Sequence, residues 1–199
     1  MQCTLFNLPP LPEKPQETIV VPVKLRPHLI PFFYQEFKEE VAAHYLQHKV
    51  KACKLSATSS LGKIIRITLE KSKQPIKPQK YYVYFSIPTK ISKCTAQVYV
   101  TEKGKTSFLK VPEKVALHIN EIFEDLFRYT FVTRINNVLK YAPEIKLDTL
   151  ILDFMKEYDL EEFGFRLDSM RHLYHREKKK AFFLSRFQSQ CSNRVYNYK

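Results

Sequence analysis

Glycine is scarce in this chain of 199 residues, which contains only Gly62, Gly104 and Gly164. Average usage near 7% would give roughly fourteen glycines. The three lie far apart, so neither G-x-G-x-x-G nor G-x-x-x-x-G-K-[ST] can be written anywhere in the chain. Rossmann dehydrogenases and Walker-type NTPases use these loops to hold phosphates. The sequence therefore excludes both classes, and we expect no cofactor.

Paired cysteines and long apolar runs are also lacking. Cys3, Cys53, Cys94 and Cys191 show no C-x-x-C spacing, which argues against a zinc ribbon or a redox pair. The longest stretch without Asp, Glu, Lys or Arg is residues 1–12, far short of the roughly 20 residues that a membrane span needs. The first residues lack the basic n-region of a signal peptide. We expect a cytoplasmic protein with no membrane partner.

Positive charge is abundant and unevenly distributed. The chain has 33 Lys and Arg against 20 Asp and Glu, a net charge of +13. Residues 49–110 hold 14 basic and 2 acidic side chains, residues 141–165 hold 2 and 7, and residues 166–199 hold 9 and 2. Such segregation favours a polyanionic partner, nucleic acid before anionic lipid. The alternative is that the lysines only keep a sheet soluble and its edges unpaired.

The first part of the chain reads as an arm, a strand and a helix. Residues 1–18 are Pro-rich and predict an extended arm. Residues 19–25 fit a strand that Pro22 would confine to a sheet edge. Pro27 or Pro31 would then open a helix. Its apolar residues, spaced as in a helix, are Phe33, Phe37, Val41, Tyr45 and Leu46. His44 and His48 lie four apart on it, but without a third ligand we expect no metal site.

Residues 49–110 change to a period of two. The strand patterns are K49–A52, GKIIRITLE (62–70), YYVYFSI (81–87), residues 98–100 and residues 106–110. They predict an antiparallel sheet of four or five strands with one apolar face and one basic, tyrosine-bearing face. A broad apolar stripe over residues 115–139 predicts a long helix that covers the sheet. The fold class is therefore α+β, with an α+β domain over residues 19–145.

The C-terminal part predicts a helical pair over residues 146–183 and a basic tail over residues 184–199. Asp148 and Asp168 are expected to cap the two helices, with Gly164 in the connection. Helix, short turn and basic second helix form the helix-turn-helix layout. The candidate DNA-binding residues of the second helix are Arg171, His172, His175, Arg176, Lys178 and Lys179. The alternative is a C-terminal helix that only docks on the domain, with the acidic first helix pairing against it.

The sheet offers a second candidate surface for nucleic acid. Tyrosines in a cationic field provide the stacking surfaces that single strands require. The residues concerned are Arg66, Tyr82, Tyr84, Tyr99, Lys49 and Lys51. Tyrosines on strands also serve as cross-strand packing pairs, so that alternative stays open.

Catalytic patterns are weak. E-x-K occurs at Glu36, Glu144 and Glu177, but a few such matches are expected by chance. Metal-dependent cleavage needs clustered carboxylates, and the basic sheet has only Glu70 and Glu102. We therefore expect a protein that is not an enzyme and has neither catalytic residues nor a metal site.

The arrangement of the segment ITLEKSK, the sheet and the segment YDLEEFGFRLDSMRHLYHREKKK resembles that of a family of small proteins. These are carried by bacterial plasmids, conjugative elements and phages and are often described as DNA-binding. The likeness is strongest over residues 148–180. It implies a DNA-binding regulator or accessory factor of a mobile element. We expect duplex DNA to be favoured over single strands, and the layout allows a homodimer. The alternatives are a protein-interaction module with incidental charge or a metal-dependent nuclease.

Overall fold

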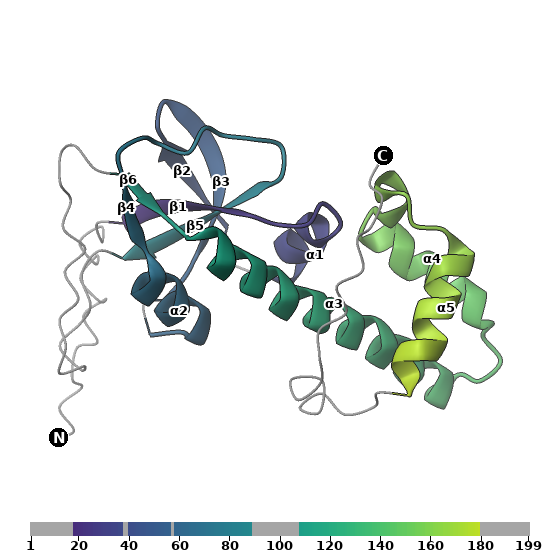
Figure 1. Cartoon of the computed structure of the whole chain (residues 1–199). Coiled ribbons are helices and arrows are strands. Elements are labelled where there is room, and N and C mark those ends of the chain that lie inside the picture. Colours follow the sequence, from purple (N-terminus) through teal and green to yellow (C-terminus); the bar gives the residue numbers. More distant parts are fainter. Residues whose placement is uncertain (1–17, 38–39, 57, 89–107, 180–199) are drawn as a thin grey trace, which may run out of the picture.

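The computed structural model describes residues 18–37, 40–56, 58–88 and 108–179. It is an α+β structure in which a long helix, α3 (Glu113–Tyr141), runs from a sheet at one end to a helical pair at the other (Figure 1). The main sheet comprises β1 (Thr18–Lys24), β2 (Glu40–Tyr45), β3 (His48–Lys54) and β5 (Tyr82–Pro88). A two-stranded sheet pairs β4 (Glu70–Ser72) with β6 (Phe108–Lys110). The remaining helices are α1 (Leu29–Glu36), α2 (Ser60–Thr68), α4 (Leu147–Glu157), the 3₁₀ helix η1 (Leu160–Phe163) and α5 (Leu167–Lys178).

The main sheet is mixed, so the prediction of a purely antiparallel sheet is wrong. Its strand order is β1-β5-β3-β2. The outer pairs, β1 with β5 and β2 with β3, are antiparallel, whereas the central pair of β3 and β5 is parallel. Parallel neighbours need a long crossover connection. Here the segment that carries α2 and β4 provides it.

Two segments have a different secondary structure from the predicted one. Residues 62–70 lie mostly in α2 because the Ser59 side chain accepts a hydrogen bond from the Gly62 N–H and begins a helix. Leu61 and Ile65, four residues apart, then face the core. The predicted helix over residues 33–46 ends at Glu36, and residues 40–45 form β2 instead. A short amphipathic segment fits either period, and tertiary packing decides between them.

One continuous core joins the sheet to the helices. The alternation in β5 is confirmed, since Val83, Phe85 and Ile87 enter the core with α1 and α3. The predicted stripe of α3 is confirmed at its buried positions, which are Ile119, Phe123, Phe127, Phe131 and Ile135. The same core continues into α4 and α5. Within the described residues, no helix is long and apolar enough to cross a membrane.

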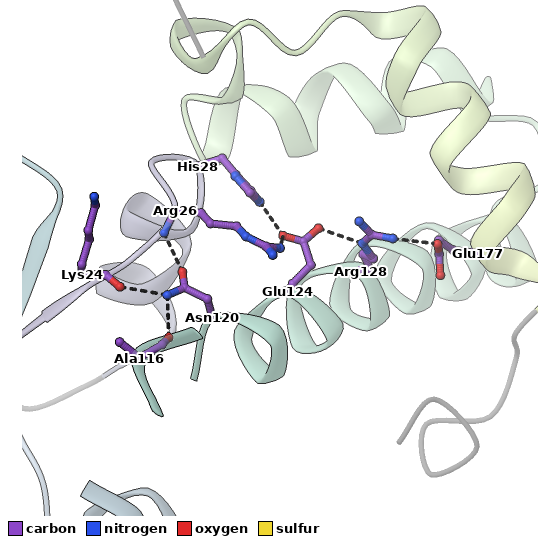
Figure 2. A network of polar contacts seen from close by, with 8 residues as sticks. All are labelled: Lys24, Arg26, His28, Ala116, Asn120, Glu124, Arg128 and Glu177. Carbon is purple, nitrogen blue, oxygen red and sulfur yellow. Dashed lines mark hydrogen bonds and ion pairs between the residues drawn. The ribbon is translucent and has the colours of Figure 1, made fainter. Parts of the chain in front are cut away.

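The outer edge of β1 is occupied, and Pro22 lies on this edge strand as predicted. Leu25 donates its N–H to the Tyr81 carbonyl, so the antiparallel register turns the backbone groups of residues 22 and 24 outward. Pro22 has no N–H to offer there. The Asn120 side chain of α3 accepts from the Arg26 N–H at 2.7 Å and donates to the Lys24 carbonyl at 2.8 Å (Figure 2). Asn120 thus takes the place of a neighbouring strand.

Candidate nucleic-acid interface

The helical pair α4 and α5 exists, but its connection is longer than a helix-turn-helix turn. Nine residues separate Glu157 from Leu167, where the motif uses three or four. They include η1 and two left-handed residues, Asp159 and Gly164, with φ of 50° and 82°. The predicted role of Gly164 in the connection is confirmed. The predicted caps are wrong by two residues each, because the N-caps are Lys146 and Arg166, and Asp148 and Asp168 lie inside the first turns.

Two of the predicted DNA-contacting cations on α5 are bound within the protein. Arg171 donates to both carboxylate oxygens of Asp148, at 3.0 and 2.7 Å, and to Asp168 at 2.9 Å. The hydrogen bond from Arg171 lowers the pKa of Asp148 and keeps it ionised. Arg176 donates to Glu177 at 3.3 Å. Because the Arg171 guanidinium binds both oxygens of Asp148, a stronger contact than a single exposed ion pair, it is poorly placed to reach phosphates or purine edges.

The remaining predicted residues of α5 are more accessible. The Lys178 ammonium lies 5.5 Å from the centre of the Tyr174 ring. His172, His175 and Lys179 are exposed. Over residues 147–178, however, eight Asp and Glu outnumber five Lys and Arg. The field of this helical pair is therefore unfavourable for a polyanion.

The predicted tyrosine face of the sheet is a packing surface. Tyr84 is only 7% exposed and packs with Tyr45 and Ala52, and Tyr82 is half-buried beside them. Burial raises the pKa of Tyr84 and keeps it uncharged. The expectation that Tyr84 offers an exposed stacking surface is wrong, because β2 and β3 supply neighbours that cover it. Tyr99 lies outside the described residues.

The cations predicted for that face are distributed elsewhere. Lys49 and Lys51 lie on β3, as expected, but on the opposite face from Tyr84, since Ala52 is the register partner of Tyr84. Lys51 lies 4.7 Å from the Tyr34 ring centre on the α1 side. Arg66 lies on α2 and not on a strand. The structure does not bring these residues together into one face.

A second group of cations lies at the sheet end of the molecule. Residues 40–88, here called the basic region, hold nine Lys and Arg against two Glu. Five of these lysines are exposed and have neither an ion-pair partner nor a ring contact among the residues that the structure describes: Lys49, Lys54, Lys63, Lys73 and Lys77. They come from β3, α2 and the loop after β4 (Figure 1). Sequence reasoning located this block by charge but singled out only Lys49 among the five.

A buried polar network connects the two ends of the molecule, and sequence reasoning missed it. Glu124 of α3 is 2% exposed and is bound by Arg26 at 3.1 Å, His28 at 2.9 Å and Arg128 at 2.8 Å (Figure 2). Arg128, 1% exposed, also donates to Glu177 of α5 at 3.2 Å. Burial alone opposes ionisation, but the His28 hydrogen bond and the charges of His28 and Arg128 lower the pKa of Glu124 well below its usual range.

The network has a structural role in positioning the elements. It ties the segment after β1 to the middle of α3 and the end of α5. Its sequence signal was a spacing of four: Asn120, Glu124 and Arg128 form a row of α3 adjacent to the row of buried phenylalanines. Polar residues repeated inside an apolar stripe indicate buried partners.

Metal-binding geometry is not present among the described residues, where no group of three or more His, Cys, Asp or Glu could hold an ion. His44 and His48 belong to the β2–β3 hairpin and not to a helix, and both are exposed.

Comparison of the chain with protein families, curated proteins and solved structures found no match. Function must therefore be argued from the residues themselves.

Proposed function

We propose that this protein binds nucleic acid through its basic region, residues 40–88, and that α5 serves mainly to complete the fold. The observation that carries the proposal is the excess of nine Lys and Arg over two Glu, with five exposed lysines that have no ion-pair partner among the described residues. Unpaired lysines can neutralise phosphates and release counterions, which supplies most of the affinity for a nucleic-acid backbone.

The contrast with α5 supports this choice of surface. The two arginines best suited to bidentate contacts, Arg171 and Arg176, are occupied by Asp148, Asp168 and Glu177. The resemblance to DNA-binding proteins of mobile elements agrees with the proposed class of ligand. It does not decide between the two surfaces.

The test is fluorescence anisotropy of a labelled duplex and a labelled single strand, titrated from about 50 to 200 mM salt. Two triple variants remove equal charge: Lys63/Lys73/Lys77→Ala in the basic region and Lys156/Lys178/Lys179→Ala in the helical pair. Each lost phosphate contact should reduce the salt slope by about one. We expect a slope lower by about three for the first variant and little change for the second.

Other results would contradict the proposal. A slope reduced only by the variant of the helical pair would place the interface on α4 and α5. Absence of binding to either oligonucleotide at low salt would exclude a nucleic-acid partner and favour a protein-interaction module.

A further inference from the structure

The basic end of the molecule contains a pocket of about 820 Å³. Its walls are the end of β1 with the following residues to Pro27, the loop residue Ile76 with Tyr81 and Tyr82, and the junction of β6 with α3. In Figure 1 these elements meet where α3 begins. The pocket is thus assembled from three segments distant in sequence.

The lining combines apolar and aromatic surface with cations. Leu25, Ile76 and Leu117 contribute apolar side chains, and Tyr81 and Tyr82 contribute half-buried rings. Lys24 and Tyr82 are register partners across β1 and β5, so their side chains leave the same face side by side. A cation beside an aromatic ring is the combination that binds a planar base and its phosphate.

The cations of the pocket differ in how freely they could bind an anion. Arg26 is held by Glu124. Lys110 lies 3.8 Å from Glu70, with the two side chains 42% and 57% exposed, and a single ion pair of this kind contributes little in solution. Lys24 is exposed and has no ion-pair partner among the described residues. Lys24 and Lys110 can therefore bind an anionic group of a ligand. Glu113, an acidic residue of the lining, would repel such a group, so the anionic groups are expected to lie away from it.

Positive charge continues beyond the pocket. The loop that contributes Ile76 and Tyr81 also carries Lys73, Lys77 and Lys80, all exposed. A ligand with one anionic group, such as a fatty acid, would leave these lysines unused. A chain with repeating phosphates would engage them while one of its bases occupies the pocket.

We propose that this pocket seats one base of a single-stranded nucleic acid, with Lys24 and Lys110 on the adjoining phosphates. The inference rests on the proposed function and refines it, because a base within a duplex is stacked and cannot enter a pocket. It moves the expected preference from duplex to single strand.

The experiment compares two labelled single strands of about twelve nucleotides that differ only in their bases. One is oligothymidine, and the other has the same number of phosphates but abasic residues. Stacking of one base should make oligothymidine bind about tenfold more tightly. Leu117, which is 52% exposed at the pocket, is changed by Leu117→Trp to fill it. Val138→Trp, at a 38% exposed position near the other end of α3, is the matched control.

Leu117→Trp should abolish the preference for oligothymidine and leave abasic binding unchanged, whereas Val138→Trp should preserve both. The chain has no natural tryptophan, so the emission of the introduced indole reports whether it has entered the pocket. Equal binding of the two strands to the unaltered protein would overturn base seating while the proposed function stands. A preference that survives a buried indole at residue 117 would overturn this location, and binding of neither strand would remove the proposed function as well.

Discussion

Replacing Arg128 by Met tests whether the buried network holds the two ends of the molecule together. Arg128 is 1% exposed and bridges Glu124 and Glu177, which are 2% and 1% exposed. Removing one partner of a buried pair costs about 3–5 kcal/mol, because a buried charge is left without compensation. Both carboxylates keep another cation, Glu124 through Arg26 and His28 and Glu177 through Arg176. We therefore expect Arg128→Met to lower the free energy of unfolding by about 3 kcal/mol, near the lower end of that range.

The assay is urea unfolding followed by far-ultraviolet circular dichroism, with a thermal melt in parallel. For a chain of this size, 3 kcal/mol corresponds to a Tm lower by about 6–12 °C. Arg134→Met is the control on the same helix, since Arg134 pairs with Glu157 where the two side chains are 47% and 39% exposed. Arg134 also donates to the Tyr158 hydroxyl, which keeps its hydrogen bond to Glu36 in the variant. The variant should therefore lower the free energy of unfolding by only about 1 kcal/mol. Adding Glu177→Gln to Arg128→Met should recover part of the loss. A loss below about 1 kcal/mol for Arg128→Met would refute the assigned role.

Three further predictions concern single residues. The pKa of Glu124 in the folded protein lies below its ordinary value of 4.5, so the ionised carboxylate stabilises the fold above that pH, and this stabilisation is lost as the pH falls further below it. In urea unfolding at a series of pH values, the free energy of unfolding of Glu124→Gln should therefore decline less steeply in acid than that of the unaltered protein. Parallel pH profiles for the two proteins would contradict this. Gly62→Ala would place a Cβ 2.1 Å from the Ser56 carbonyl oxygen and should cost about 1–3 kcal/mol, whereas the neighbouring Lys63→Ala should be nearly neutral. Leu46 has a φ of 56° at the β2–β3 turn, so Leu46→Asn should raise the unfolding free energy by about 1 kcal/mol, and an unchanged Tm would count against strain there.

Long, strongly periodic segments were predictable from the sequence. The covering helix, the alternation of β5, the edge position of Pro22 and the buried faces of α4 and α5 all follow from local spacing. Residues 40–45 and 62–68 were assigned the wrong type because fewer than three helical turns of amphipathic sequence also satisfy a strand pattern. The parallel pairing of β3 and β5 depends on the path of the segment between them, which no residue in either strand reveals.

The sequence predicted the positive charge of the candidate site but not how its residues are arranged in space. The excess of lysine in the basic region could be counted in the sequence. The face of the molecule on which each lysine lies, however, depends on whether its segment forms a helix or a strand. The pairing of Arg171 with Asp148, 23 residues away, removed a candidate that looked exposed in the pattern. The contact of His28 with Glu124 spans 96 residues. Local periodicity carries no information about partners at such separations.

The closed edge of β1 limits where a strand from another copy of the chain can be added to this sheet. Because Pro22 and the Asn120 amide occupy that edge, an added strand can extend the described four-stranded sheet only beside β2, its other edge strand. If two copies joined there, each would use its one open edge and a two-fold pair would result, with nothing left to recruit a third. A sheet open at both edges could instead add copies without end. Pro22 and the Asn120 side chain together therefore favour a finite assembly over a fibre.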